Sequence, residues 1–264
     1  MNRLEEIIAH KWAEIGRRQR LRPMEDLETA ALAAPPPPSF AAALRRPPGS
    51  PVRLIAEIKR ASPSRGALAA QLDALRLADI YRQNGAAAIS VLTDSRFFSG
   101  SLADLHSVAA LPDSPPVLCK DFILSPYQIL EARAAGASAV LLIAACLTPA
   151  DLKRLYDFTC QTGMDALIEV HSLPELEAAL NCRPQVIGVN NRDLRSFEVN
   201  LQISLNLIQH LPAEMVRVAE SGIHTAEDAR QLAKAGFDAL LVGEALVTSP
   251  DPGAKLRELL GRPA

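Results

Sequence analysis

The sequence predicts an α/β fold, a (β/α)8 TIM barrel with an N-terminal helical extension. From Arg53 onward, eight short apolar segments alternate with segments of helical periodicity, at roughly the spacing of a βα unit. The apolar segments are apolar on both faces, which is typical of parallel strands covered by helices. A glycine turn precedes three of them, in 84–88, 135–139 and 235–239. A doubly wound open sheet is the weaker alternative, since no GxGxxG motif follows the first strand.

The first fifty residues differ in pattern from the rest of the chain. Residues 3–18 carry apolar side chains at helical spacing, and residues 23–33 and 39–44 indicate two shorter helices. The proline run 35–38 excludes a helix between them. We therefore divide the chain into an extension, residues 1–50, and a barrel domain, residues 51–264. The pattern does not decide whether the extension is a packing appendage or a cover over an active site.

The elements of the barrel follow in regular order. The expected strands are residues 54–58, 86–92, 116–119, 139–144, 166–170, 186–189, 216–219 and 239–242. The expected helices are residues 71–84, 102–111, 127–135, 149–161, 174–180, 201–210, 225–235 and 253–260. Thr225 is a predicted N-cap, and a further short helix is expected to begin near Glu244. Residues 62–66 are expected to form a mobile loop.

Composition excludes several classes of function. The 264 residues carry a net charge of -2 and only 4% aromatic residues, which argues against a nucleic-acid-binding surface. The four cysteines are scattered without a CxxC pair, which predicts a reducing compartment with neither a zinc site nor a disulfide framework. No apolar run reaches the roughly 20 residues of a membrane helix. We expect a cytoplasmic protein that binds neither membrane nor nucleic acid.

Polar and charged residues follow the predicted strands at their C-terminal ends, where TIM barrels place their chemistry. These residues are Glu57 and Lys59, Lys120 and Asp121, Glu169, Asn190 and Arg192, Glu220 and Ser221, and Glu244. One buried ion pair can be structural, but charge at the ends of so many strands is a heavy electrostatic load for a core. The pattern therefore favours an active site over a structural cluster.

Two further features concern binding. Gly222 and Gly243 directly follow the last two strands, where backbone amides commonly hold a phosphate. Phe97 and Phe98 follow the second strand, either as an apolar wall for a ring or as core packing. The histidines show no metal-ligand spacing, so packing is the favoured interpretation even for His171 and His224 near the predicted site.

The chain resembles the indole-3-glycerol phosphate synthase family over nearly its whole length. The matching segments, in the family's order, are 55–64, 90–94, 98–101, 118–122, 167–170, 187–194, 219–223 and 242–246. The N-terminal helices are similar to the family's extension as well. The proline-rich spacer and Cys119, where a larger apolar residue is common, are mild departures.

The resemblance implies a phosphorylated small-molecule substrate, 1-(2-carboxyphenylamino)-1-deoxyribulose 5-phosphate. The implied carboxy-lyase closes the pyrrole ring with loss of CO₂ and water, in tryptophan biosynthesis, and no cofactor or metal is implied. Lys120 matches the family's general acid and Glu169 its general base. Lys59 matches a second lysine, an acid for dehydration, although the division of acid duties between the lysines stays open. A monomer is expected.

The remaining roles also come from the resemblance. Glu57 would orient the lysines, Asn190 would position Glu169, and Arg192 would hold an anion. Glu220 and Ser221 would complete the floor, and Phe98 stands at an aromatic position. The predicted phosphate ligands are Ser62, Gly222, Gly243 and the amide of Glu244.

Three rival functions fit the sequence less well. Phosphoribosylanthranilate isomerase requires a cysteine at the end of the first strand, which is absent here. A Schiff-base aldolase would also use a buried lysine. A non-catalytic barrel that binds a phosphorylated ligand would not need an acid and a base facing each other.

Overall fold

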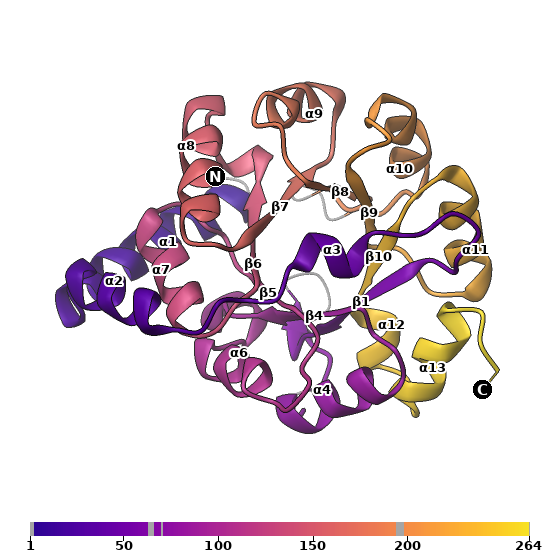
Figure 1. The fold of residues 1–264 in the computed structure, drawn as a ribbon, viewed down its shortest axis with the longest axis horizontal. Helices are drawn as coiled ribbons and strands as arrows, with labels where there is room; N and C mark the ends of the chain where they lie inside the picture. The colour runs from indigo at the N-terminus through magenta and orange to yellow at the C-terminus, as the bar shows by residue number, and fades with distance from the viewer. Residues whose placement is uncertain (1–2, 63–65, 70, 194–197, 264) are drawn as a thin grey trace.

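The protein forms a closed barrel of eight parallel strands surrounded by helices, as predicted (Figure 1). The computed structural model describes residues 3–62, 66–69, 71–193 and 198–263. Around the ring the strands run in the order β1-β10-β9-β8-β7-β6-β5-β4, and β4 pairs with β1 to close it. The strands are β1 (Arg53–Ile58), β4 (Ala88–Leu92), β5 (Val117–Lys120), β6 (Ala139–Ile143), β7 (Asp165–Val170), β8 (Val186–Asn190), β9 (Val216–Glu220) and β10 (Ala239–Val242).

The strand register places the polar strand ends at one rim. Lys120 lies opposite Leu92 of β4, Glu169 opposite Ile143 of β6, and Asn190 opposite Glu220 of β9. Parallel strands end at the same side of the barrel, so these side chains share its C-terminal face.

The helices that cover the barrel lie close to their predicted positions. They are α4 (Ala74–Gln83), α6 (Leu102–Ala109), α7 (Pro126–Ala134), α8 (Pro149–Gln161), α9 (Leu173–Leu180), α10 (Gln202–Leu207), α11 (Ala226–Ala235), α12 (Glu244–Val247) and α13 (Pro252–Leu259). Thr225 caps α11 in a full capping box, as predicted. Helix α4 begins later than expected because Asp73 caps it by accepting from the N–H groups of Leu75 and Arg76.

Two local features differ from the sequence prediction. Part of the segment expected to be a loop forms a small antiparallel pair, β2 (Ala61–Ser62) with β3 (Gly66–Ala67), and the residues between lie outside the described part of the chain. A short helix, α5 (Ser95–Phe98), was not predicted; Asp94 caps it. Its four residues are too few for a periodic pattern to be visible.

The N-terminal segment touches both ends of the barrel. It forms α1 (Arg3–Leu21), α2 (Met24–Ala33) and α3 (Phe40–Leu44), and α1 and α2 project beside α7 (Figure 1). Helix α3 lies across the middle of the ring in this view, where Phe40 and Leu44 are buried in one cluster with side chains of the barrel interior. The carboxylate of Asp165, at the start of β7, accepts the Ala41 N–H at 2.9 Å, so α3 closes the N-terminal mouth.

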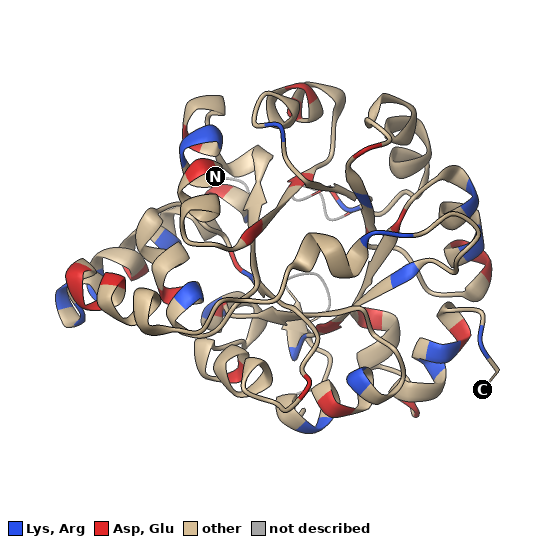
Figure 2. Ribbon diagram, in the orientation of Figure 1, with Lys and Arg blue, Asp and Glu red and all other residues tan. Residues whose placement is uncertain are grey.

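Charged residues of both signs are spread over the outer helices, including α1 and α2 (Figure 2). Within the described residues, no helix is both long and apolar enough to cross a membrane.

Candidate active site

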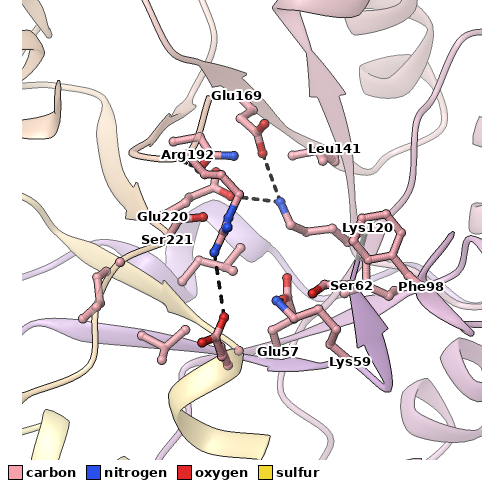
Figure 3. Close-up of a pocket in the computed structure, with 18 of the residues that line it drawn as sticks. Glu57, Lys59, Ser62, Phe98, Lys120, Leu141, Glu169, Arg192, Glu220 and Ser221 are labelled. Atoms are coloured by element: carbon pink, nitrogen blue, oxygen red, sulfur yellow. Dashed lines mark hydrogen bonds and ion pairs between the residues drawn. The ribbon is translucent and has the colours of Figure 1, made fainter. Parts of the chain in front are cut away.

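A pocket opens at the C-terminal rim, and all thirteen residues predicted for the site line it. They are Glu57, Lys59, Ser62, Phe98, Lys120, Glu169, Asn190, Arg192, Glu220, Ser221, Gly222, Gly243 and Glu244. Figure 3 shows the labelled members converging from several strands. The structure thus brings the predicted residues together, while the role of each remains a proposal.

The end of β1 supplies an ion pair on one wall of the pocket. Lys59 Nζ lies 2.7 Å from Glu57 Oε1, and the Glu57 side chain is buried. A Cβ atom at position 243 would collide with the Glu57 carboxylate. Gly243 is therefore required by the packing of Glu57, a reason that the sequence pattern alone, which indicated only a ligand contact, did not reveal.

Lys120 points into the pocket between two glutamates (Figure 3). Its Nζ donates to Glu169 Oε2 at 3.1 Å and to Glu220 Oε2 at 2.9 Å. Burial alone would lower the pKa of this ammonium, but the carboxylates of Glu169, Glu220 and Glu57 raise it above its ordinary value. Lys120 is therefore charged and carries a proton at neutral pH.

The two glutamates that share Lys120 have opposite protonation preferences. Burial, reinforced by the nearby charge of Glu169, raises the pKa of Glu220 to about 8 against the pull of Lys120. Burial also opposes the charge of Glu169, yet Lys120 and a hydrogen bond from Asn190 lower its pKa. The site thus pushes the pKa values of the two glutamates apart, so that Glu220 is the weaker acid of the pair and Glu169 the stronger.

Glycine also makes room for the second glutamate. Gly188 lies on β8 behind Glu220, and a Cβ there would overlap the Glu220 carboxylate. Gly188 does not line the pocket, so its importance was visible only after the fold placed β8 beside β9.

The ends of β8 and β9 shape the far wall. Asn190 Oδ1 accepts the Arg192 N–H at 2.9 Å, and a guanidinium nitrogen of Arg192 lies 3.8 Å from Glu244 Oε2. Ser221 and Gly222 both have positive φ angles, 66° and 75°, so the chain turns sharply after β9. Two features disfavour a side chain at Gly222: its positive φ angle, and the close contact that a Cβ would make with Val199.

An apolar wall faces these polar groups. The rings of Phe98 and Phe122 lie 6.3 Å apart, and Leu141 and Ile143 of β6 line the pocket beside them. Phe97 and Phe98 were expected either to form an apolar wall or to pack in the core, and each does one of the two. Phe98 lines the pocket, whereas Phe97 is buried in a core cluster.

Sequence reasoning missed the apolar lining and Asp94. Leu141 and Ile143 lie on β6, which has no charged residue at its end, so only their period-two spacing could have indicated that they share a face. Asp94 lines the pocket as well, and in the structure it caps α5, a helix that the sequence did not predict.

The two histidines near the site differ from each other, and the packing role expected for His224 is wrong because that side chain is exposed. His171 is absent from the pocket lining, and its Nδ1 lies 2.8 Å from the backbone oxygen of Asn190. His224 does line the pocket. Among the described residues there is no cluster of three or more side chains suited to hold a metal ion.

Comparisons with known proteins give a consistent result over nearly the whole chain. A family model described as indole-3-glycerol phosphate synthase matches residues 4–259. The chain is 50% identical to the indole-3-glycerol phosphate synthase of Roseiflexus castenholzii (strain DSM 13941 / HLO8), with 98% of each chain covered. It is 49% identical to that of Chloroherpeton thalassium (strain ATCC 35110 / GB-78), over 94% of this chain and 96% of the relative. It is 47% identical to that of Opitutus terrae (strain DSM 11246 / JCM 15787 / PB90-1), over 99% of each.

More distant solved structures share the fold. A 3-hexulose-6-phosphate synthase from Salmonella typhimurium superposes with a TM-score of 0.65 at 11% identity, covering 80% of this chain and 97% of that one. A thiamine phosphate pyrophosphorylase from Pyrococcus furiosus gives a TM-score of 0.59 at 17% identity, with 80% and 96% covered. At such identities the likeness concerns the barrel alone.

Proposed function

The chain belongs to the indole-3-glycerol phosphate synthase family, and we propose that its rim pocket performs the family's reaction with Lys120 as acid and Glu169 as base. The enzyme is a carboxy-lyase of tryptophan biosynthesis. Its substrate is 1-(2-carboxyphenylamino)-1-deoxyribulose 5-phosphate. The observation that carries the assignment is the placement of Lys120 between Glu169 and Glu220, in the same pocket as the pair formed by Lys59 and Glu57.

Ring closure requires a proton at the ketone oxygen. The aryl carbon that bears the carboxylate attacks the ketone carbon at C2, and the Lys120 ammonium donates a proton to the oxygen. Lys120 and Glu169 are only 3.1 Å apart, so turnover requires this pair to open. Opening removes the carboxylate that raises the pKa of Lys120, and the ammonium becomes a stronger acid where it meets the ketone.

Decarboxylation and dehydration complete the reaction. CO₂ leaves the ring carbon, and the electrons of the broken bond restore the aromatic ring. The hydroxyl at C2 then leaves as water with a proton from Lys59, while Glu169 accepts a proton from C1 and the double bond of the pyrrole ring forms. Glu57 orients Lys59 through their 2.7 Å ion pair, and Asn190 holds Glu169 through its hydrogen bond.

The two ends of the substrate have different chemistry, and the pocket offers a different wall to each. We assign the aryl ring to the apolar wall of Phe98, Phe122, Leu141 and Ile143. We assign the phosphate to Ser62 and to the turns at Gly222 and at Gly243–Glu244. Arg192 and Ser221 lie between these regions and are assigned to the anionic and hydroxyl groups of the substrate.

Direct assay of the purified protein tests the assignment. Formation of indole-3-glycerol phosphate is followed by its fluorescence, with quantitative release of one CO₂ per product. A barrel that only binds a phosphorylated ligand would give no product, and a Schiff-base aldolase would be inactivated by borohydride in the presence of substrate. Neither outcome is expected here.

The domain division, the oligomeric state and the cellular compartment belong to the same proposal. Residues 1–50 form a helical extension to a catalytic barrel of residues 51–264. The enzyme works as a monomer in the cytoplasm, and its four free cysteines suit a reducing compartment. Sedimentation of the active enzyme checks the oligomeric state, and a single-chain species is expected.

A further inference from the structure

A lysine outside the pocket is fully buried in the N-terminal extension. Lys11 of α1 is 1% exposed, and its Nζ lies 2.7 Å from Asp94 Oδ2, 2.8 Å from Asp121 Oδ1 and 2.8 Å from Glu14 Oε2. Burying a long cationic side chain is costly unless its partners require it. Burial opposes the charge, but Asp121 and Asp94 raise the pKa of Lys11, so it is a cation in the folded protein.

Two of these partners belong to loops of the active site. Asp94 directly precedes α5, and its Oδ1 accepts the Phe97 N–H at 2.6 Å. Asp121 directly follows Lys120, and its Oδ1 accepts the Phe122 N–H at 2.8 Å. Thr93 Oγ1 donates to Asp121 Oδ2 at 2.8 Å, so the two loops already meet at this point.

The loops fastened in this way carry the apolar wall. Phe98 is the last residue of α5, and Phe122 follows Asp121 directly. Their rings lie 6.3 Å apart and both line the pocket. The relative position of the two rings therefore depends on the distance between two buried carboxylates that share one cation.

We propose that Lys11 is a positioning residue that clamps the Asp94 and Asp121 loops together and so sets the width of the aryl subsite between Phe98 and Phe122. The N-terminal extension thereby contributes to substrate binding without touching the substrate. This inference rests on the proposed function, because the aryl ring of the substrate is what the subsite holds.

Charge explains why a lysine is needed at this position. Without Nζ, two buried carboxylates would face each other with no cation between them, and like charges at close range in a buried site repel strongly. The loops would then separate or one carboxylate would take up a proton. In either case the Phe98 and Phe122 rings would lose the spacing that Lys11 imposes.

The chain offers a matched control on the same helix. Arg18 lies two turns after Lys11 and pairs with Glu14 and with Glu131 of α7, so it fastens α1 to the barrel through the same network. Its ion pairs are with these two glutamates, and Asp121 acts on it only as a more distant charge. Removing Arg18 should weaken the attachment of α1 and leave the aryl subsite unchanged.

The experiment compares Lys11→Met and Arg18→Met by steady-state kinetics at a temperature where both are folded. For Lys11→Met we expect KM and the dissociation constant of indole-3-glycerol phosphate to rise together by about tenfold, which corresponds to ~1.4 kcal/mol. The value of kcat should stay within about threefold, because lost uniform binding affects KM alone. Arg18→Met should lower Tm without changing KM.

A second variant breaks the link from the other side. Asp94→Asn keeps a side-chain oxygen to cap α5 but removes the charge that Lys11 holds. We expect a several-fold rise in KM, and this variant carries the test if Lys11→Met does not fold. Both changes break one link, so the double variant should show a KM no higher than that of Lys11→Met.

Three outcomes would each overturn the clamp. They are an unchanged KM in Lys11→Met or Asp94→Asn, equal effects of Lys11→Met and Arg18→Met on KM, and additive effects on KM in the double variant. Failure of the wild-type protein to form product would instead refute the proposed function, so the two failures are distinguishable.

Discussion

Replacing Lys120 by methionine is the sharpest perturbation of the proposed chemistry. Methionine keeps much of the length and apolar volume of the lysine stem but cannot donate a proton or carry charge. In the structure it would remove the donor to Glu169 at 3.1 Å and to Glu220 at 2.9 Å in one step. The change therefore tests the acid and the charge balance of the site together.

The expected magnitude has a kinetic and a thermodynamic part. Loss of a general acid lowers kcat by about 10²–10⁴-fold. Removing one partner of a buried ion pair costs about 3–5 kcal/mol of folding stability. Part of this cost is pH-dependent. Without the ammonium, the pKa of Glu169 rises above the unfolded value and the already raised pKa of Glu220 rises further, so the folded state is favoured at low pH and loses that stability as pH rises through the raised values. The stability gap between wild type and Lys120→Met should widen from pH 5 to pH 8.

Stopped-time fluorescence assays of product formation give kcat, and urea unfolding at each pH gives the stability gap. Lys153→Met serves as the matched control, because Lys153 pairs with Asp157 on the exposed face of α8 and does not line the pocket. A Lys120→Met enzyme with wild-type kcat would remove Lys120 from its role. A stability gap that narrows as pH rises would refute the predicted rise in the pKa values of Glu169 and Glu220, even if activity were lost.

Four further outcomes are expected. Glu169→Gln should lower kcat by about 10²–10⁴-fold, with product affinity by calorimetry little changed; unaltered kcat would exclude Glu169 as the base. Gly188→Ala should lower kcat/KM by about 10²-fold, because its Cβ would displace the Glu220 carboxylate, while circular dichroism stays native; full activity would contradict the crowding. The raised pKa of Glu220 contributes stability that is fully present below its ordinary pKa of 4.5 and is lost as pH rises through about 8. The wild type should therefore lose more unfolding free energy between these pH values than Glu220→Gln does; equal losses would argue against a raised pKa at Glu220. Phe40→Ala should cost about 3–5 kcal/mol in urea unfolding and leave KM unchanged, since α3 lies at the mouth opposite the site; a changed KM would mean that the two ends are coupled.

Most of the fold could be predicted because its signals are local. Apolar strands, glycine turns and helix caps such as Thr225 are each fixed by a few neighbouring residues. The elements that escaped prediction are short, as α5 and the β2–β3 pair show. Two to four residues cannot display a period, so tertiary contacts decide their conformation.

The candidate site was predictable where chemistry requires charge at strand ends, and was not predictable where it depends on distance in space. Lys120 and Glu169 have a visible signal, since ionisable residues rarely end buried strands without a reason. The role of Gly188 depends on Glu220 of the neighbouring strand, and the setting of Lys11 depends on two loops more than eighty residues away in sequence. Neither relation leaves a pattern in the local sequence.

Two glycines and two glutamates show how the barrel accommodates its acidic groups. Gly243 is backed by Glu57 and Gly188 by Glu220, and in both cases a Cβ would occupy the space of the carboxylate. A closed barrel normally fills its interior with layers of branched side chains, so a carboxylate at the rim must take its volume from a neighbour. A glycine on the adjacent strand, or directly after it, supplies that volume without moving the backbone. Each of these buried glutamates therefore requires its neighbouring glycine. Alanine at either glycine should impair the site while the fold persists.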